Sequence, residues 1–369
     1  ASLTILPWRQ DTALFACDLW TAGAPFEACS RNILGRQVAR AAAMGFTMNL
    51  GLEAEFFVFR DQPGSPAPLS ALPHLEKPAY DTTRLLDNLD WLGELVEAMN
   101  GLGWDVYSFD HEDGIGQVEI DFAYAEVRRM ADRYVFLRLM ANAIARKHGA
   151  FACFMPKPFG DRTGSGAHFN MSLADGESGT NLFARDDDPR GCGLSDLGYQ
   201  FLAGILRHLP AIMATVAPQV NSYKRLVKQG SMSGFTWAPI FACYGNNNRT
   251  NAIRIPKGGG RIELRAADSA CNPYLGAAMC LAAGLEGIEE GLDPGEPNTD
   301  NMYLLSDEEL ARRGIAVLPR TLEEAVAAFK GDPLSEKVFG AEMFKSWTEF
   351  KEQEWLSYLN HVSDWEMQR

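Results

Sequence analysis

The stretch GLEAEFFVF, residues 51–59, reads as a strand with one acidic face. Because successive strand residues point to opposite sides of a sheet, Glu53 and Glu55 share one face and apolar residues take the other. Three more segments alternate in this way: Glu119 and Asp121 in GQVEIDF (116–122), His168, Asn170 and Ser172 in GAHFNMSL (166–173), and Glu263 and Arg265 in RIELRA (261–266). Polar and apolar residues also alternate in a sheet whose outer face is merely solvated, but Lys and Thr would be enough for such a face. Carboxylates repeated over four strands therefore favour a functional site.

Working outward from this stretch, the hydrophobic pattern divides the chain into strands and helices. It predicts strands over 14–17, 46–59, 106–109, 116–124, 153–155, 166–173, 251–256 and 261–266, and helices over 32–44, 81–102, 125–148, 197–216 and 272–291. The last seventy residues are helical and acidic, and the proline-rich segment 61–79 is a surface loop or lid. Strands and helices that do not strictly alternate predict an α+β fold with an antiparallel sheet.

Composition excludes several functional classes. The 369 residues hold 34 Lys and Arg against 48 Asp and Glu, and this net charge of −14 lacks the basic surface that nucleic acid requires. No apolar run approaches the length of a membrane span, and the N-terminus lacks the pattern of a signal peptide. The seven cysteines form no CxxC pair, which indicates free thiols in a reducing compartment. We therefore expect a cytoplasmic protein with no nucleic-acid or membrane partner.

The acidic face predicts a metal centre. Glu53, Glu55, Glu112, Glu119 and Glu263 would bring five negative charges together, and such carboxylates cannot all stay ionised without cations. Oxygen ligands with at most one imidazole, His168, favour Mg²⁺ or Mn²⁺ over zinc. His111, beside Glu112, is either a further ligand or a packed, orienting histidine.

Basic residues gather in three motifs that follow. These are Lys224 and Arg225 in NSYKRL, Arg249 and Arg254 in NNNRTNAIRIP, and Arg261 and Arg265 in GGGRIELR. Arginines bind carboxylate and phosphate bidentately, so arginines beside an acidic, metal-binding face indicate phosphoryl transfer to or from a carboxylate. The alternative is an internal network of salt bridges. The glycine-rich turns at 164–166 and 258–260 match neither a Walker loop nor a dinucleotide fingerprint.

Five motifs, in this order, resemble the glutamine synthetase family: GLEAEFF, HEDGIGQVE, MPKPFGD with GSGAH, NSYKRL, and NRTNAIRIP with GRIELRAAD and NPYL. The resemblance runs from about Ile5 to the C-terminus. It implies that residues 1–369 form a catalytic domain whose curved antiparallel sheet is the catalytic face, with helices packed outside. It also implies a homo-oligomer of stacked hexameric rings, a dodecamer, in which the family's small N-terminal β-grasp domain, absent from this chain, covers the neighbouring subunit's site.

The resemblance also implies roles for individual residues. Glu55, Glu112 and Glu119 would hold one metal, and Glu53, His168 and Glu263 a second that bridges the ATP phosphates. Gly164, His168, Arg225 and Arg265 match glutamate-binding positions, Arg249, Arg254 and Arg261 match phosphate and nucleotide contacts, and Tyr124 and Ser172 match the adenosine site. The implied reaction has two steps, in which ATP phosphorylates the γ-carboxylate of L-glutamate and an amine then displaces phosphate. Arg249, Glu263 and Trp237 are the implied catalytic residues.

The motif GFTWAP, residues 234–239, carries Trp237 where ammonia-using members of the family carry Glu. An indole cannot attract ammonium by charge but offers an apolar wall to an alkyl group, unless it merely packs the flap. The motif resembles the branch that makes γ-glutamylmethylamide from methylamine. The alternatives are a glutamine synthetase, a γ-glutamylpolyamine synthetase or, from a different class, a catalytically silent structural relative. Tyr303 lies near a position that is adenylylated in some members, but its surrounding sequence differs, and we expect a solvent-exposed tyrosine.

Overall fold

A computed structural model describes residues 2–62, 67–69, 79–227 and 237–368 of the chain. The described strands form a nine-stranded sheet around the long central strand β5 (Phe46–Arg60), in the order β11-β12-β13-β10-β5-β7-β6, while β8 and β9 also pair with β5. The other strands are β6 (Val106–His111), β7 (Gln117–Phe122), β8 (Ala125–Glu126), β9 (Ala150–Cys153), β10 (Ala167–Asp175), β11 (Tyr244–Asn246), β12 (Ile253–Ile255) and β13 (Ile262–Leu264). The pairs are antiparallel except β11 with β12, which is parallel.

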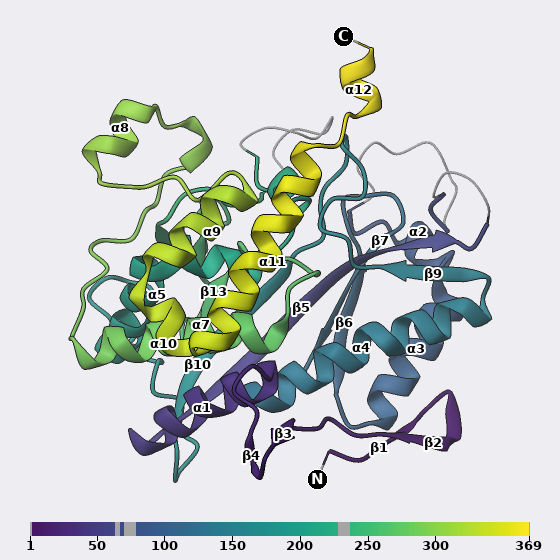
Figure 1. Ribbon diagram of the computed structural model, residues 1–369, viewed down its shortest axis with the longest axis horizontal. Helices are drawn as coiled ribbons and strands as arrows, with labels where there is room; N and C mark the ends of the chain where they lie inside the picture. Colours follow the sequence, from purple (N-terminus) through teal and green to yellow (C-terminus); the bar gives the residue numbers. More distant parts are fainter. Residues whose placement is uncertain (1, 63–66, 70–78, 228–236, 369) are drawn as a thin grey trace.

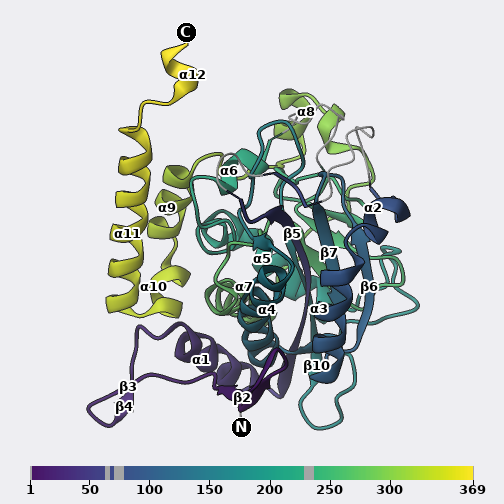
Figure 2. The ribbon, with the colours of Figure 1, turned by 90° about the vertical axis from the view of Figure 1, so that its right-hand side faces the viewer.

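Four long helices pack together behind this sheet (Figures 1 and 2). They are α1 (Ser30–Ala43), α4 (Val127–Lys147), α5 (Asp196–Val216) and α7 (Pro273–Glu289). Further helices lie outside them: α3 (Leu89–Gly101) against α4, and α9 (Leu322–Gly331), α10 (Pro333–Phe339) and α11 (Ala341–Leu359) on the α5 and α7 side. The short elements are β1 (Thr4–Leu6), β2 (Arg9–Leu14), β3 (Trp20–Thr21), β4 (Ala24–Pro25), α2 (Thr82–Leu86), α6 (Ser222–Arg225), α8 (Asp307–Arg312) and α12 (Asp364–Met367).

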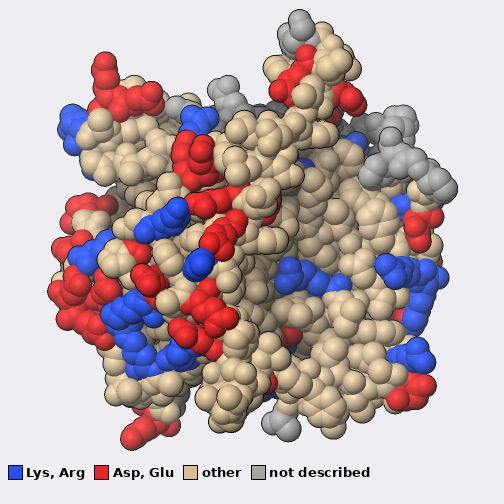
Figure 3. All heavy atoms as spheres, in the orientation of Figure 1, with Lys and Arg blue, Asp and Glu red and all other residues tan. Residues whose placement is uncertain are grey.

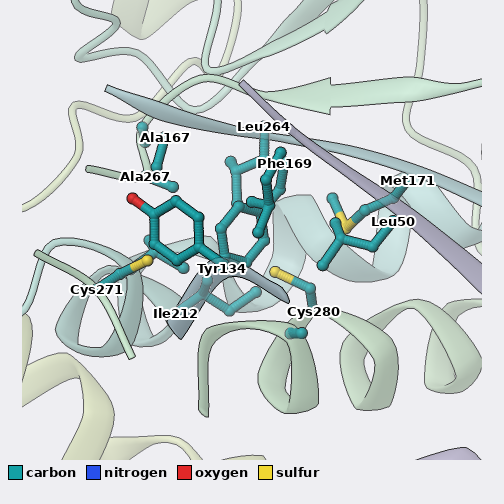
Figure 4. Packing of buried hydrophobic residues seen from close by; sticks show 14 of the residues in the cluster. Leu50, Tyr134, Ala167, Phe169, Met171, Ile212, Leu264, Ala267, Cys271 and Cys280 are labelled. Atoms are coloured by element: carbon teal, nitrogen blue, oxygen red, sulfur yellow. The ribbon is translucent and has the colours of Figure 1, made fainter. Parts of the chain in front are cut away.

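The core lies between the sheet and these helices. Figure 4 shows Leu50 of β5, Phe169 and Met171 of β10 and Leu264 of β13 meeting side chains of the helices behind them, among them Tyr134 of α4, Ile212 of α5 and Cys280 of α7. All of these side chains are fully buried. The apolar residues that alternate with the acidic ones in β5 therefore fix which side of the sheet faces outward.

The structure confirms the α+β class and most of the predicted elements, with three corrections. The strand predicted over 153–155 is β9, which begins at Ala150 and ends at Cys153. The helix predicted over 81–102 is two helices, α2 and α3, which meet at Asp87 and Asn88. The Asn88 side chain donates to the Arg84 carbonyl and accepts from the Trp91 indole, so it stabilises the break that periodicity does not reveal. The strand predicted over 14–17 is instead β2, because the β1–β2 hairpin pairs Thr4 with Leu14 and ends there.

Other predictions concern the surface. Within the described residues, no helix is long and apolar enough to span a bilayer, and all seven cysteines are free thiols. On the face shown in Figure 3, acidic and basic side chains are interspersed, and the described residues there form no broad basic surface. Much of the predicted loop over 61–79, namely residues 63–66 and 70–78, lies outside the described residues.

Candidate active site

Strand register brings the predicted acidic residues onto one face of the sheet. Glu55 of β5 pairs with Glu119 of β7, and Glu53 of β5 pairs with His168 of β10. On the other side of β10, Asn170 pairs with Glu263 of β13, which in turn pairs with Arg254 of β12. Directly opposed residues in neighbouring strands project to the same face. The polar residues that alternate in the sequence therefore lie on a single surface, built from five strands.

Glu53, His168 and Glu263 form a cluster whose potential ligand atoms all lie within 4.8 Å of one another. His168 Nδ1 lies 2.8 Å from Glu53 Oε2 and 3.6 Å from Glu263 Oε1. Glu263 is fully buried and forms ion pairs with Arg254, at 2.6 Å, and with Arg265. Two carboxylates and one imidazole suit Mg²⁺ or Mn²⁺, so these residues fit the second metal position.

Glu55, Glu112 and Glu119 form a second acidic group beside the first. Glu55 Oε2 accepts the Gly166 N–H at 2.7 Å, and Glu112 Oε2 accepts the Asp113 N–H at 3.3 Å. Burial, followed by repulsion from Glu55, raises the pKa of Glu112 to about 7, and the same two causes hold the pKa of Glu119 well above its ordinary value. Among the described residues, Glu112 and Glu119 have no ion-pair partner, so their pKa values stay high where a divalent cation would lower them.

The two halves of the acidic face differ electrostatically. Burial alone would raise the pKa of Glu53, but the hydrogen bond and charge of His168 outweigh it and lower that pKa to about 2. Asp121, two residues after Glu119, has no such partner, and burial together with the charge of Glu53 raises its pKa to about 7. Glu53 and Glu263 are thus ion-paired within the protein, whereas Glu112, Glu119 and Asp121 form no ion pair with the described residues.

The predicted glutamate-binding residues surround this face. Arg225 is buried and donates to the backbone carbonyls of Arg265 and Ala266, at 3.0 and 3.2 Å. None of the described carboxylates forms an ion pair with Arg225, so its charge is available to an anionic ligand. Gly164 packs directly on it, because a Cβ there would overlap the Pro156 carbonyl oxygen and lie 2.8 Å from Arg225 Cγ. Only glycine fits this position without displacing the arginine.

The predicted nucleotide-binding residues continue along the same face. Asn170 donates to Glu53 Oε1 at 2.9 Å and accepts from Arg261 Nε at 3.0 Å, so it links the cluster of Glu53, His168 and Glu263 to an exposed arginine. Ser172, which follows Asn170 by two positions in β10, lies opposite Asn49 of β5. Gly51 of β5 leaves space flanked by Asn170 and by Tyr124, which is 67% exposed. The side chain of Arg249 is exposed, while its carbonyl accepts from Arg265 Nε at 3.3 Å.

Trp237 is 41% exposed, and its backbone is left-handed, with φ of 55°. This conformation is unfavourable for a bulky residue and is characteristic of constrained functional segments. Residues 234–236 of the GFTWAP motif lie outside the described part of the chain.

The expectation of an exposed Tyr303 is wrong, since it is 5% exposed and donates to the Ala238 carbonyl at 2.7 Å. The 3₁₀ turn Met302–Leu304 places it against the segment that carries Trp237, a long-range contact that local sequence does not encode.

The sequence left two roles open for His111 and indicated none for Gln117. His111 is buried, with Nδ1 2.7 Å from the Glu112 carbonyl oxygen and Nε2 accepting the Gly116 N–H at 3.3 Å, which favours the orienting interpretation over metal ligation. Gln117 is buried at the start of β7 and contacts both Glu55 and Gly164. Its position two residues before Glu119, on the same face, is the signal that would have suggested a role.

Comparison with known proteins agrees with this geometry. The family model described as "Glutamine synthetase, catalytic domain" matches residues 27–369. The "Glutamate–methylamine ligase" of Methyloversatilis universalis is 42% identical over 367 residues, which cover 100% of this chain and 82% of that protein. A "Glutamine synthetase" of Rhizobium leguminosarum bv. phaseoli is 39% identical over 366 residues, covering 99% and 82%. The solved structure "GmaS/ADP complex-Conformation 1" matches with a TM-score of 0.91 at 39% identity, covering 100% of this chain and 83% of that one.

Proposed function

Because this chain belongs to the glutamine synthetase family, we propose that it uses ATP to join an amine, with methylamine preferred, to the γ-carboxylate of L-glutamate. The observation that carries the proposal is the single sheet face on which a cluster suited to a metal, Glu53, His168 and Glu263, adjoins Arg225, which is buried and forms no ion pair with the described carboxylates. The products are γ-glutamylmethylamide, ADP and phosphate.

The proposed chemistry explains why acidic and basic groups share the face. Amide formation directly from a carboxylate fails because hydroxide is a poor leaving group, so the γ-carboxylate first attacks the terminal phosphate of ATP. Arg249, Arg254 and Arg261 neutralise the transferring phosphoryl group, while Arg225 and Arg265 orient glutamate against Gly164. The amine then attacks γ-glutamyl phosphate and releases phosphate.

Divalent cations complete the proposed site. We propose two or more Mg²⁺ or Mn²⁺ ions, one held by Glu55, Glu112 and Glu119 and the other by Glu53, His168 and Glu263. When bound, they supply positive charge to the ATP phosphates and to the developing acyl phosphate. The donor chemistry of both groups and the raised pKa of Glu112 support this assignment.

Trp237 supports the choice of methylamine over ammonia. The indole brings no negative charge, and the Tyr303 hydroxyl bonds the carbonyl of the next residue, Ala238, which helps to hold the segment. One buried methyl group in an apolar pocket contributes about 1–3 kcal/mol, or roughly 10–200-fold in relative kcat/KM. Ammonia is therefore expected to remain a poor substrate without being fully rejected.

The test measures ADP release with L-glutamate against methylamine, ammonia, ethylamine and a polyamine. We expect the highest kcat/KM with methylamine, and a shift of the ratio toward ammonia in Trp237→Glu but not in the control Trp237→Phe. A wild-type preference for ammonia or for the polyamine would support the corresponding alternative activity. No ADP release with any amine would favour the catalytically silent relative.

We further propose a cytoplasmic homo-oligomer of stacked hexameric rings. The free thiols support the compartment. Helix α12 projects from the body at the C-terminal end of the chain (Figure 1). Large apolar side chains are exposed along the second half of α11, in the segment after it and in α12: Phe350, Leu356, Leu359, Val362, Trp365 and Met367. Such a patch favours burial against another copy. Native mass measurement of the full-length protein tests this, and a fully active monomer would contradict it.

A further inference from the structure

The side chain of Gln117 is buried in the centre of the site and is fully hydrogen-bonded. Its Nε2 donates to Glu55 Oε2 at 3.3 Å and to the Gly164 carbonyl oxygen at 3.1 Å. Its Oε1 accepts from the Gly114 N–H at 3.0 Å and from Thr163 Oγ1 at 2.8 Å. A glutamine amide offers two donor hydrogens and two acceptor lone pairs, so this side chain uses all four.

The chemistry of these neighbours fixes which way the amide points. The Gly164 carbonyl and an ionised Glu55 carboxylate accept hydrogen bonds and cannot donate them, while the Gly114 N–H donates and cannot accept. Nε2 must therefore face Glu55 and Gly164, and Oε1 must face Gly114. Reversing the amide would leave buried groups unsatisfied, which costs about 1–3 kcal/mol for each group.

This one amide joins three parts of the site that are distant in sequence. Glu55 belongs to the proposed metal group, and Gly164 packs on the arginine proposed to bind glutamate. The third part is the turn that carries Glu112. The backbone of Gln117 also holds this turn, because the Glu112 N–H donates to the Gln117 carbonyl at 3.0 Å and the Gln117 N–H donates to the Gly114 carbonyl at 2.8 Å. A movement of the Glu55 carboxylate is therefore transmitted to Gly164 and to the turn through a single rigid planar group.

We propose that Gln117 is a positioning residue that couples divalent-cation binding at Glu55 to glutamate binding at Gly164. The inference rests on the proposed function, because it assigns the two ligands to those residues. A cation that fixes Glu55 fixes the amide, and the amide then holds the Gly164 backbone in the position that receives glutamate. By linkage, glutamate tightens cation binding by the same factor as the cation tightens glutamate binding.

Two variants separate this role from simple support of the fold. Gln117→Met keeps the side-chain volume but removes all four hydrogen bonds. Gln117→Glu keeps an acceptor oxygen for Gly114 and Thr163 but removes both donors, so the turn retains its contacts while Glu55 and Gly164 lose theirs. The matched control is Gln37→Met, which alters a buried glutamine of α1, on the helical side of the sheet.

The measurement is the Kd of Mn²⁺ with and without saturating L-glutamate, read by electron paramagnetic resonance, together with the thermal midpoint of each variant. We expect wild type and Gln37→Met to show the same coupling, in the range of about 5–150-fold, and both Gln117 variants to show a coupling smaller by about fivefold or more. Gln117→Glu brings a carboxylate oxygen close to Glu55 Oε2, so its thermal midpoint is expected to fall. A loss of coupling measured well below the midpoint of each variant, and not shared by Gln37→Met, reports positioning.

Coupling retained in Gln117→Glu, or absent from wild type, overturns the inference. A wild-type protein that binds no Mn²⁺, or that releases no ADP with any amine, contradicts the proposed function instead.

Discussion

Binding of Mg²⁺ or Mn²⁺ at slightly acidic pH is expected to release protons, because cations and protons compete for the unpaired half of the acidic face. The pKa of Glu112 lies at about 7 in the cation-free protein, raised by burial and then by the charge of Glu55. At pH 6.5 this one carboxyl holds about three quarters of a proton, and at pH 8 about one tenth. A cation that engages Glu112 displaces that proton, so the cation's affinity rises as the pH rises toward 8.

The same shift determines how the stability of the cation-free protein depends on pH. The ordinary pKa of Glu112 is 4.5, so between pH 4.5 and about 7 the folded state binds more protons than the unfolded state. The free energy of unfolding therefore falls as the pH rises through this window, by about 3 kcal/mol if one carboxyl carried the whole shift. Asp121, raised to about 7 mainly by burial, adds in the same direction. Added cation is expected to reverse this loss.

Titration calorimetry with Mn²⁺ in two buffers of different ionisation enthalpy, at pH 6.5 and 8, counts the released protons. We expect at least about three quarters of a proton per subunit at pH 6.5 and fewer at pH 8. Glu112→Gln is the matched variant, and it should release fewer protons and flatten the fall in the thermal midpoint of the cation-free protein between pH 5 and 7. Zero release at pH 6.5, or a midpoint of the wild-type protein that rises with pH across that window, would refute the reasoning.

Three further predictions follow from individual contacts. Glu53→Ala is expected to abolish turnover by removing one residue of the proposed metal cluster, and a near-wild-type rate at saturating Mg²⁺ would show that the two-metal interpretation is wrong. Gly164→Ala places a Cβ against a backbone carbonyl, so we expect an overpacking cost of about 1–3 kcal/mol and a KM for glutamate raised about tenfold, measured by initial rates. His208, buried between Asp332 at 2.7 Å and Glu286 at 2.9 Å, bridges α5, α7 and the α9–α10 junction. His208→Leu removes the imidazole partner of Asp332, while Glu286 keeps Arg207 at 3.7 Å, and should cost about 1–3 kcal/mol of unfolding free energy in urea, with kcat retained by the folded fraction.

The sequence predicted the acidic face well because strand periodicity is a strict constraint. A slip of one residue in β5 would bury Glu53 and Glu55 and expose Leu52 and Ala54, so the alternation itself determines which residues share the face. The sequence could not predict contacts that depend on long-range packing. Gln117 meets residues 62 and 47 positions away, and Tyr303 meets Ala238, 65 positions away. The break between α2 and α3 depends on a side-chain bond of Asn88, which hydrophobic periodicity does not record.

The ion-paired half of the acidic face is also expected to respond to a cation. In the cation-free protein Glu263 is neutralised by Arg254 and Arg265, two residues proposed to contact phosphate and glutamate. A cation held by Glu263 competes with those guanidinium groups for the same buried carboxylate oxygens, and each arginine displaced gains a free charge in a buried setting. A bound phosphate or carboxylate is the partner that would satisfy that charge. The ion pairs of Glu263 therefore link cation binding to substrate binding a second time, through arginines rather than through Gln117.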